Sequence, residues 1–411
     1  MAIRLLGGSV AFSPMFRDTL NTRHDGATDA GVRDIEELLK ETKVTTEMPP
    51  ISELGFGHRV HHPLPPWEEA LALVNDFFQY QHRLLPLFDP PKFVASFGSQ
   101  YTDDPPRDSA WWASLNVVLA ISSRRRQESF AGDCALQHQA SDYVANAMGV
   151  LLEVMMQNIS LASVQAISAL SWFYIGTSQP QPACMLSAAA VRLAYNIGLH
   201  DPEAHADKLP ADKELGERVF WTAWCIDHHL SFRTGRPLPR LPDKPYAALT
   251  IDHQERPASQ TLEKNKPTAS HLYNIGVKLS LIETDVSSWL GSSKLSASTT
   301  EDQAAIRRHL KDKLENWSQD LPELDMRRSG NDGPDPEIQR EIIRLNMRYL
   351  ECIIMLHRVH RSQNHFVVQE SITASNTSPD IDYCLETCAS AAKSIAQLVA
   401  VVPKREDSFC W

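Results

Sequence analysis

The stretch DPEIQREIIRLNMRYLECIIMLH, residues 335–357, carries a helical repeat of apolar side chains. These side chains recur at steps of four and three, which places them on one face of an α-helix: Ile338, Ile342, Leu345, Tyr349, Cys352 and Leu356. Asp335 can cap this helix, and Pro336 suits its first turn because that position needs no N–H donor. The stretch therefore predicts one long amphipathic helix that must pack against others.

Helical patterns extend over most of the chain after residue 67. They predict helices at residues 68–87, 109–125, 142–157, 161–175, 182–197, 212–231, 269–290, 300–320, 336–360 and 381–401. Alternating β-branched runs hardly occur outside residues 366–368. The predicted fold class is all-α, a large irregular bundle of about ten helices. Long connecting loops are expected at residues 233–267 and 326–335, which are rich in proline, glycine and charge.

The first 63 residues differ from the rest in composition. Glycines and prolines interrupt them repeatedly, and only residues 31–43 predict a helix there. We interpret residues 1–63 as an N-terminal arm and linker, and residues 64–411 as the helical body. At roughly 100–200 residues per domain, this length allows either two or three packed units or one large all-helical body.

Charge and cysteine content narrow the class of protein. A formal net charge of −11 repels phosphate, so bulk binding to nucleic acid or to an anionic membrane is not expected. The seven cysteines are scattered, and the close pair Cys384 and Cys388 has helical rather than zinc-ligand spacing. No uninterrupted apolar run approaches the roughly 18 residues of a membrane span. We expect a reduced intracellular protein with no metal site and no membrane contact.

Two motifs lie in the first half of the chain. The first is aromatic and contains LPP at 64–66, FF at 77–78, LPLF at 85–88 and then Phe93. The second is AAAVRLA at 188–194, which closes on Gly198-Leu199-His200. Its alanines let a neighbouring helix approach closely, and Gly198 suits the left-handed residue that ends a helix. We expect this second helix at the centre of the bundle.

The third motif is ERVFW at 217–221, followed by Asp227, Ser231, Gly235-Arg236-Pro237 and Asp243. Phe220, Trp221 and Trp224 widen the apolar surface of this helix well beyond one face, which predicts a helix enclosed on several sides. Gly235-Arg236-Pro237 is interpreted as a stiff turn and not as a phosphate cradle, because no helix is predicted to follow it directly.

Read in order, the three motifs resemble the middle homology region of fungal binuclear zinc-cluster transcription factors, the fungal-specific transcription factor domain. The resemblance implies that residues 64–411 are its helical regulatory domain. It also implies that the six-cysteine zinc cluster lies upstream of the arm and is missing from this sequence, so zinc is expected only there. Family members continue through more helices, which suggests a truncated C-terminus here.

The resemblance selects eight structural motif residues: Arg192, Gly198, Arg218, Trp221, Asp227, Gly235, Arg236 and Pro237. An acid among arginines can be catalytic or can hold an anion, but such clusters are more often structural ion-pair networks, which is our interpretation. Arg218 and Asp227 are separated by about 900° of helical rotation and so face opposite sides. We therefore predict that Asp227 pairs with Arg192 or Arg236 and not with Arg218.

Other candidate sites are weaker. His357 and His360 share a helical face but lack acidic companions for a metal. Arg124-Arg125-Arg126 follows an apolar helix, where cations complement the helix dipole, and a nuclear-import or DNA patch is the alternative. No nucleophile elbow, phosphate loop or dinucleotide fingerprint occurs. No catalytic, cofactor-binding or metal-binding residue is therefore assigned, and the protein is not expected to be an enzyme.

The resemblance implies a nuclear regulator of pathway genes transcribed by RNA polymerase II. It implies a homodimer or transcriptional co-regulators as partners, DNA contact only through the missing zinc cluster, and a small-molecule effector. An effector between helices is physically reasonable, since aromatic side chains and methionines commonly line such clefts. Two alternatives stay open: a stand-alone regulatory or cofactor protein without DNA binding, and an enzyme recruited from the same scaffold, which would require converging acid, base or nucleophile residues.

Overall fold

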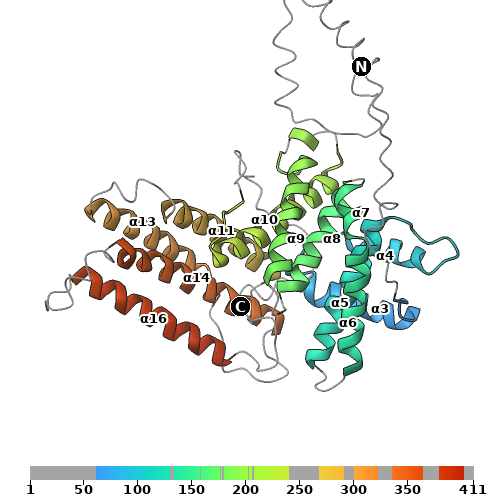
Figure 1. The fold of residues 1–411 in the computed structure, drawn as a ribbon, viewed down its shortest axis with the longest axis horizontal. Coiled ribbons are helices and arrows are strands. Elements are labelled where there is room, and N and C mark those ends of the chain that lie inside the picture. The colour runs from blue at the N-terminus through green and yellow to red at the C-terminus, as the bar shows by residue number, and fades with distance from the viewer. Residues whose placement is uncertain are drawn as a thin grey trace, which may run out of the picture.

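The computed structural model describes residues 62–129, 134–157, 159–175, 177, 180–201, 203–205, 208–239, 268–290, 300–322, 336–363 and 379–401. Every regular element within these ranges is helical (Figure 1), which confirms the all-α prediction. Almost all of the N-terminal arm lies outside the described residues, including the helix expected at 31–43. The strand-like residues 366–368, Asp243 and most of both expected long loops lie outside them as well.

The first half of the described chain forms one helical layer around its own core. Its helices are α3 (Trp67–Asp76), α4 (Pro90–Gln100), α5 (Ser109–Ser129), α6 (Cys134–Gly149), α7 (Leu151–Met156), α8 (Leu161–Ile175), α9 (Pro180–Asn196) and α10 (Pro210–Thr234). Helix α5 packs against α6 and α8, and α8 packs against α9 and α10. Every side chain from Ser163 to Ser171 on α8 is buried, so α8 is enclosed on all sides.

The second half forms another layer with a second core. It consists of α11 (Ala269–Leu290), α13 (Thr300–Gln319), α14 (Pro336–Gln363) and α16 (Pro379–Val401). The apolar stripe of the quoted stretch faces inward, because Leu345, Cys352 and Leu356 are 0% exposed. Figure 1 shows these yellow-to-red helices on one side of the molecule and α3 to α9 on the other. Among the described helices, none combines the length and apolarity needed to cross a membrane.

Helices α10 and α11 join the two layers. Most buried residues of α10 belong to the first core, whereas Phe232 near its end belongs to the second. Helix α11 lies mainly in the second core, but its Val277 belongs to the first. Groups placed where α10 and α11 meet therefore touch both halves of the molecule. We call this region the seam.

The opening motif folds differently from the single helix expected at 68–87. Helix α3 ends at Asp76, a π-helical turn follows at Phe77–Gln81, and the chain then turns with Leu85 and Leu87 buried. Helix α4, which was not predicted, begins after Asp89, whose carboxylate accepts a hydrogen bond from the Lys92 N–H at 3.0 Å. Tertiary burial of the aromatic turn overrides the continuous apolar pattern there. The helix expected at 142–157 is likewise divided, into α6 and α7.

Two glycines end helices in the left-handed conformation, as expected for Gly198. Its φ is 73°, and the N–H of Leu199 donates to the Ala194 carbonyl at 3.0 Å. Gly235 has a φ of 67°, and the N–H of Arg236 donates to the Ser231 carbonyl at 2.9 Å. Both follow the geometry that satisfies the last carbonyls of a helix. Helix α10 continues to Thr234 and ends at Gly235. The loop expected from residue 233 therefore begins later.

Candidate functional site

A column of stacked rings runs along α10 at the seam. Trp224 and His228 stack with ring centroids 4.8 Å apart, and His228 and Phe232 stack at 6.2 Å. The four-residue spacing brings these rings onto one helical face. All three side chains are buried, and His228 is 0% exposed. The imidazole is therefore held rigidly between two aromatic rings.

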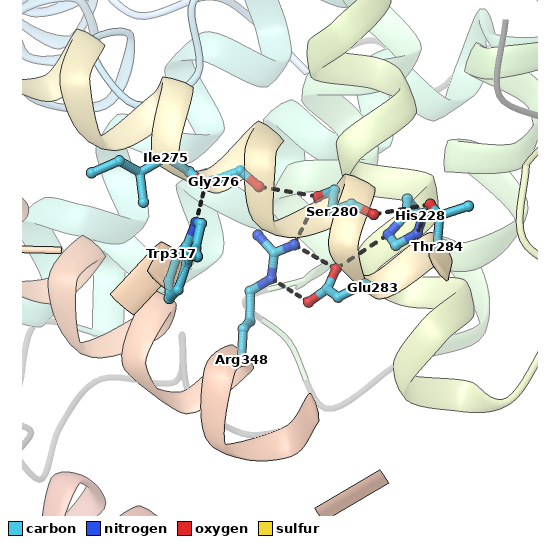
Figure 2. A network of polar contacts seen from close by, with 8 residues as sticks. All are labelled: His228, Ile275, Gly276, Ser280, Glu283, Thr284, Trp317 and Arg348. Atoms are coloured by element: carbon cyan, nitrogen blue, oxygen red, sulfur yellow. Dashed lines mark hydrogen bonds and ion pairs between the residues drawn. The ribbon is translucent and has the colours of Figure 1, made fainter. Parts of the chain in front are cut away.

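A buried network of charged groups crosses the seam beside this column (Figure 2). Arg348 of α14 donates to Glu283 of α11 from Nε at 3.1 Å and from Nη2 at 2.7 Å. The same Nη2 donates to the Ser280 hydroxyl at 2.8 Å. His228 Nδ1 lies 3.3 Å from the Glu283 carboxylate, and its Nε2 lies 3.0 Å from the Thr284 hydroxyl. Three helices thus meet at one carboxylate.

The electrostatics of the network favour its ionised form. Burial alone would raise the pKa of Glu283, but the charge and hydrogen bonds of Arg348, together with the nearby His228, outweigh burial, so this pKa lies below its ordinary value. Burial likewise opposes the charge of Arg348, but Glu283 raises the pKa of the guanidinium. The buried ion pair is consequently tied together by charge as well as by geometry.

A cavity of about 90 Å³ opens next to this network, between α8, α10, α11 and α14. Its apolar wall comes from both sides of the seam and includes Leu84, Leu85, Trp172, Ile175, Ile226 and Val277. Its polar wall includes His229, Glu341, Arg344 and Arg348. Tyr273 and Thr222 also line it, and their hydroxyl oxygens lie 3.0 Å apart. An interhelical cavity with a few polar groups is the usual form of a small-molecule site.

The polar groups of this wall differ in whether they have a partner. Arg344 is paired with Glu341, and its guanidinium lies 4.6 Å from the centre of the Trp172 ring. His229 Nδ1 is buried and has no hydrogen-bond partner among the described residues. Burial, and then the nearby charges of Arg348 and other arginines, hold the pKa of His229 well below its ordinary value. The ring is therefore neutral.

The structure places the eight motif residues in different surroundings. Trp221 is buried and forms edge contacts with the rings of Phe220 and Trp224. Arg218 donates to the Pro86 carbonyl at 3.0 Å and lies 3.6 Å from Glu214. Arg192, by contrast, is exposed, and so is Pro237. None of these four residues lines the seam cavity.

The predicted ion pair of Asp227 with Arg192 or Arg236 was wrong. Asp227 accepts a hydrogen bond from the Ser187 hydroxyl at 2.7 Å. Arg236 donates to Gln181 at 2.7 Å and reaches Asp227 only as a nearby charge. Burial raises the pKa of Asp227, and the hydrogen bond from Ser187 reduces that rise. The expectation that Asp227 does not pair with Arg218 was correct.

The three arginines at 124–126 contact other residues of the helical body. Arg124 donates to the Phe173 carbonyl at 2.5 Å, and its guanidinium lies 4.3 Å from the Phe173 ring centre. Arg125 lies 3.7 Å from the Tyr80 ring centre, and Arg126 donates to Asp76 at 2.6 Å. Cations held in this way are poorly placed to contact phosphates. The structure therefore does not favour the DNA-patch interpretation.

The described residues contain no group of three or more His, Cys, Asp or Glu side chains placed to hold a metal ion. His357 Nδ1 lies 3.5 Å from the Cys384 sulfur, while the side chain of His360 lies outside the description. The absence of a metal from this chain stays a prediction.

Comparison with known proteins agrees with the three motifs. The model of the fungal-specific transcription factor domain matches residues 74–319. The chain belongs to this family. All eight motif residues and Glu283 lie inside the matched segment of the fungal-specific transcription factor domain, whereas Arg348 lies beyond it. The seam site therefore combines the matched segment with a helix that follows it.

The chain is also similar to named fungal transcription factors. It is 33% identical to the fusaridione A cluster transcription factor of Fusarium heterosporum, over 88% of this chain and 68% of that protein. It is 32% identical to an ABC-transporter-regulating transcription factor of Aspergillus fumigatus, over 87% of this chain and 40% of that protein. The protein of the same name from Aspergillus oryzae is 30% identical over 99% of this chain and 46% of its own length. The chain thus spans less than half of the last two relatives.

Sequence reasoning missed Glu283 and Arg348, although a signal was present. The apolar stripe of α11 includes Leu279, Ile282 and Val286, and Glu283 lies beside it, four residues after Leu279 and three before Val286. Arg348 stands beside the stripe of α14 in the same way. A charge inside an apolar stripe predicts a buried partner, but one sequence does not say which residue that partner is.

Proposed function

We propose that this chain works in the nucleus as the regulatory domain of a fungal transcription factor and not as an enzyme. The match of the family model to residues 74–319 carries this proposal. The motif residues of that segment, such as Trp221 and Gly235, serve packing and helix termination. The named relatives are transcription factors. The alternatives, a stand-alone cofactor and an enzyme, are therefore not favoured.

We assign the reading of DNA to a zinc cluster that residues 1–411 do not encode. Specific reading needs a protein element in a groove of the duplex, backed by phosphate contacts. The formal net charge of −11 opposes phosphate binding. The partly buried Arg124, Arg125 and Arg126 contact groups within the fold. These features support a division of labour between a DNA-reading segment and this helical body.

The proposed regulatory input is a small molecule bound at the seam, and the proposed partners are a second copy of the chain or transcriptional co-regulators. The seam suits an input site because its cavity is lined by helices of both layers. A ligand there shifts the packing of the layers only if it binds one arrangement better than another. The proposed targets are the genes of a pathway, and RNA polymerase II transcribes these genes.

Fusion to a zinc-cluster segment of known operator tests the division of labour. The chain alone, the fusion protein and the zinc-cluster segment alone are titrated by fluorescence with the operator and with scrambled DNA at physiological salt. We expect specific binding by the fusion protein and the segment, and none by the chain alone. In fungal cells, the fusion protein should change expression of an operator-driven reporter relative to the segment alone, and it should accumulate in the nucleus. Operator preference by the unfused chain, or equal reporter expression from the fusion protein and the segment, would contradict the proposal.

A further inference from the structure

The seam cavity has one wall of apolar side chains and one of polar side chains, and Arg344 and Arg348 of α14 supply its guanidinium donors. Building on the regulatory function proposed above, we infer that this cavity binds a small, uncharged, largely apolar molecule that presents a hydrogen-bond acceptor to Arg348. A ring bearing a carbonyl or ether oxygen has this chemistry. Four properties of the cavity lead to this class of ligand.

The first property is an unused donor. Nε and Nη2 of Arg348 donate to Glu283 and Ser280, whereas no hydrogen bond from Nη1 occurs among the described residues. Gly276 keeps the space beside this nitrogen open, because a Cβ at residue 276 would lie 3.9 Å from Nη1. A guanidinium only donates hydrogen bonds, so its complement is an acceptor oxygen or nitrogen.

The second property is the balance of charge in the polar wall. Arg348 is paired with Glu283, and Arg344 with Glu341. His229 adds no charge, because burial and the nearby arginines lower its pKa. An anion entering this wall would lose its hydration without meeting an unpaired cation, and a cation would find no unpaired carboxylate. An uncharged ligand avoids both costs.

The third property is size. A cavity of about 90 Å³ is smaller than the engineered cavity of about 150 Å³ that accepts benzene in another protein. The apolar wall, with Trp172, Ile226 and Val277, matches a compact hydrocarbon surface. The buried part of the ligand is therefore smaller than benzene, and a six-membered ring would be only partly enclosed.

The fourth property concerns Cys225, which also lines the cavity. Burial raises the pKa of this thiol to about 12. A thiol with such a pKa is a poor nucleophile at neutral pH, because the thiolate is the reactive form. We therefore assign no covalent bond to the ligand. Contact with Ile226 of α10 and Arg348 of α14 at once would couple its binding to the packing of the two layers.

Matched ring compounds test the ligand class on the full chain. Cyclohexanone carries the acceptor, methylenecyclohexane replaces its oxygen with a CH₂ group, and cyclohexanecarboxylate carries a negative charge. Binding is followed by ligand-observed NMR titration and by the shift in thermal midpoint. We expect saturable binding of the ketone, about tenfold tighter than the alkene, as a hydrogen bond to a charged donor implies. The carboxylate should bind more weakly than the ketone.

Gly276→Ala separates ligand binding from folding. Its added methyl group would lie 3.5 Å from the Leu345 side chain, an ordinary contact, while occupying space beside Arg348 Nη1. We expect ketone binding about tenfold weaker with an unchanged or higher thermal midpoint, since alanine favours a helix over glycine. Gly98→Ala on α4 is the matched control, because a Cβ there meets nothing within 4 Å. Binding to this control should equal that of the wild type.

Three outcomes would overturn the inference: equal affinity for the ketone and the alkene, tightest binding of the carboxylate, or unchanged ketone binding in Gly276→Ala. The reporter experiment distinguishes this failure from that of the proposed function. A fusion protein that regulates the reporter while no ring compound binds would refute the ligand site alone. Ketone binding as described, with a fusion protein that does not regulate, would support the ligand site and refute the regulatory function.

Discussion

Arg348 on α14 donates two hydrogen bonds to the carboxylate of Glu283 on α11, at 3.1 and 2.7 Å. The two residues are 65 positions apart in sequence, and the Glu283 side chain is 1% exposed. A buried charge that loses its partner retains the cost of desolvation without its compensation. Among substitutions at the seam, those that break this pair should therefore lower the free energy of unfolding the most.

Removal of the carboxylate tests this expectation. Glu283→Ala should lower the free energy of unfolding by about 3–5 kcal/mol, because it leaves the Arg348 charge buried and unpaired. Chemical denaturation measures the effect. Asp285→Asn is the control on the same helix, where the exposed Asp285 pairs with the exposed Lys313 at 3.0 Å, and its effect should stay within about 0.5 kcal/mol. A Glu283→Ala effect as small as that of the control would show that the buried pair does not stabilise the fold.

The same carboxylate predicts a pH dependence. Its pKa in the folded chain is lowered, so its stabilising contribution is full above the unfolded pKa of about 4.3 and is lost as the pH falls through the folded pKa. The difference in unfolding free energy between wild type and Glu283→Gln should be constant near neutral pH and should shrink in acid. Denaturant titrations at a series of pH values would measure it. A difference that grows as the pH falls contradicts the lowered pKa.

Gly235 should not tolerate a side chain. Its φ of 67° lies in the left-handed region, where an alanine costs roughly 1–2 kcal/mol. Gly235→Ala should therefore lower stability by about that amount, as measured by thermal or chemical unfolding. Gly98→Ala lies in a helix without crowding and should stabilise by up to about 1 kcal/mol. Equal effects of the two substitutions would argue against the cap geometry.

Asp227 should respond to mutation as a hydrogen-bond acceptor and not as half of an ion pair. Asp227→Asn keeps an oxygen for the Ser187 hydroxyl and removes a buried charge, so stability should change by less than about 1 kcal/mol. Because burial raises the pKa of Asp227, any stabilising contribution from its titration is full below the unfolded pKa and is lost as the pH rises through the folded pKa. A loss of several kcal/mol in Asp227→Asn at neutral pH would restore the ion-pair interpretation.

The purified chain should bind no stoichiometric metal. Its cysteines lack zinc-ligand spacing, and the described residues bring no three ligand side chains together. Elemental analysis after dialysis should find well under one zinc per chain. About one metal per chain, lost in a His357→Ala variant, would show that a site exists.

The sequence predicts helices best where many apolar side chains coincide with clear ends. The expected ranges 161–175 and 269–290 agree with α8 and α11 to the residue. The expected helix at 68–87 failed because Phe77, Phe78 and Leu85 continue the apolar pattern through a turn that is defined by burial against other helices. Local patterns do not encode such a contact.

The candidate site could be predicted less well than the fold. Gly198 was identified because a helix end has a local signature, whereas Gly235, interpreted as part of a stiff turn, also proved to end a helix. Arg348 and Glu283 were not, since their pairing depends on how α11 and α14 align, and a single sequence carries no measure of that alignment. Asp227 was assigned the wrong partner for the same reason: Ser187 on α9 is 40 residues away and carries no charge.

The continuity of α10 has a consequence for how the chain folds. One unbroken helix contributes Trp224 to the first core and Phe232 to the second, so neither core is complete until α10 has formed. The two halves should therefore melt as one cooperative transition, with matching amide hydrogen-exchange protection on both sides of the seam. A fragment ending at Thr234 would expose Phe232 and His228 to water, and we expect it to aggregate rather than fold alone.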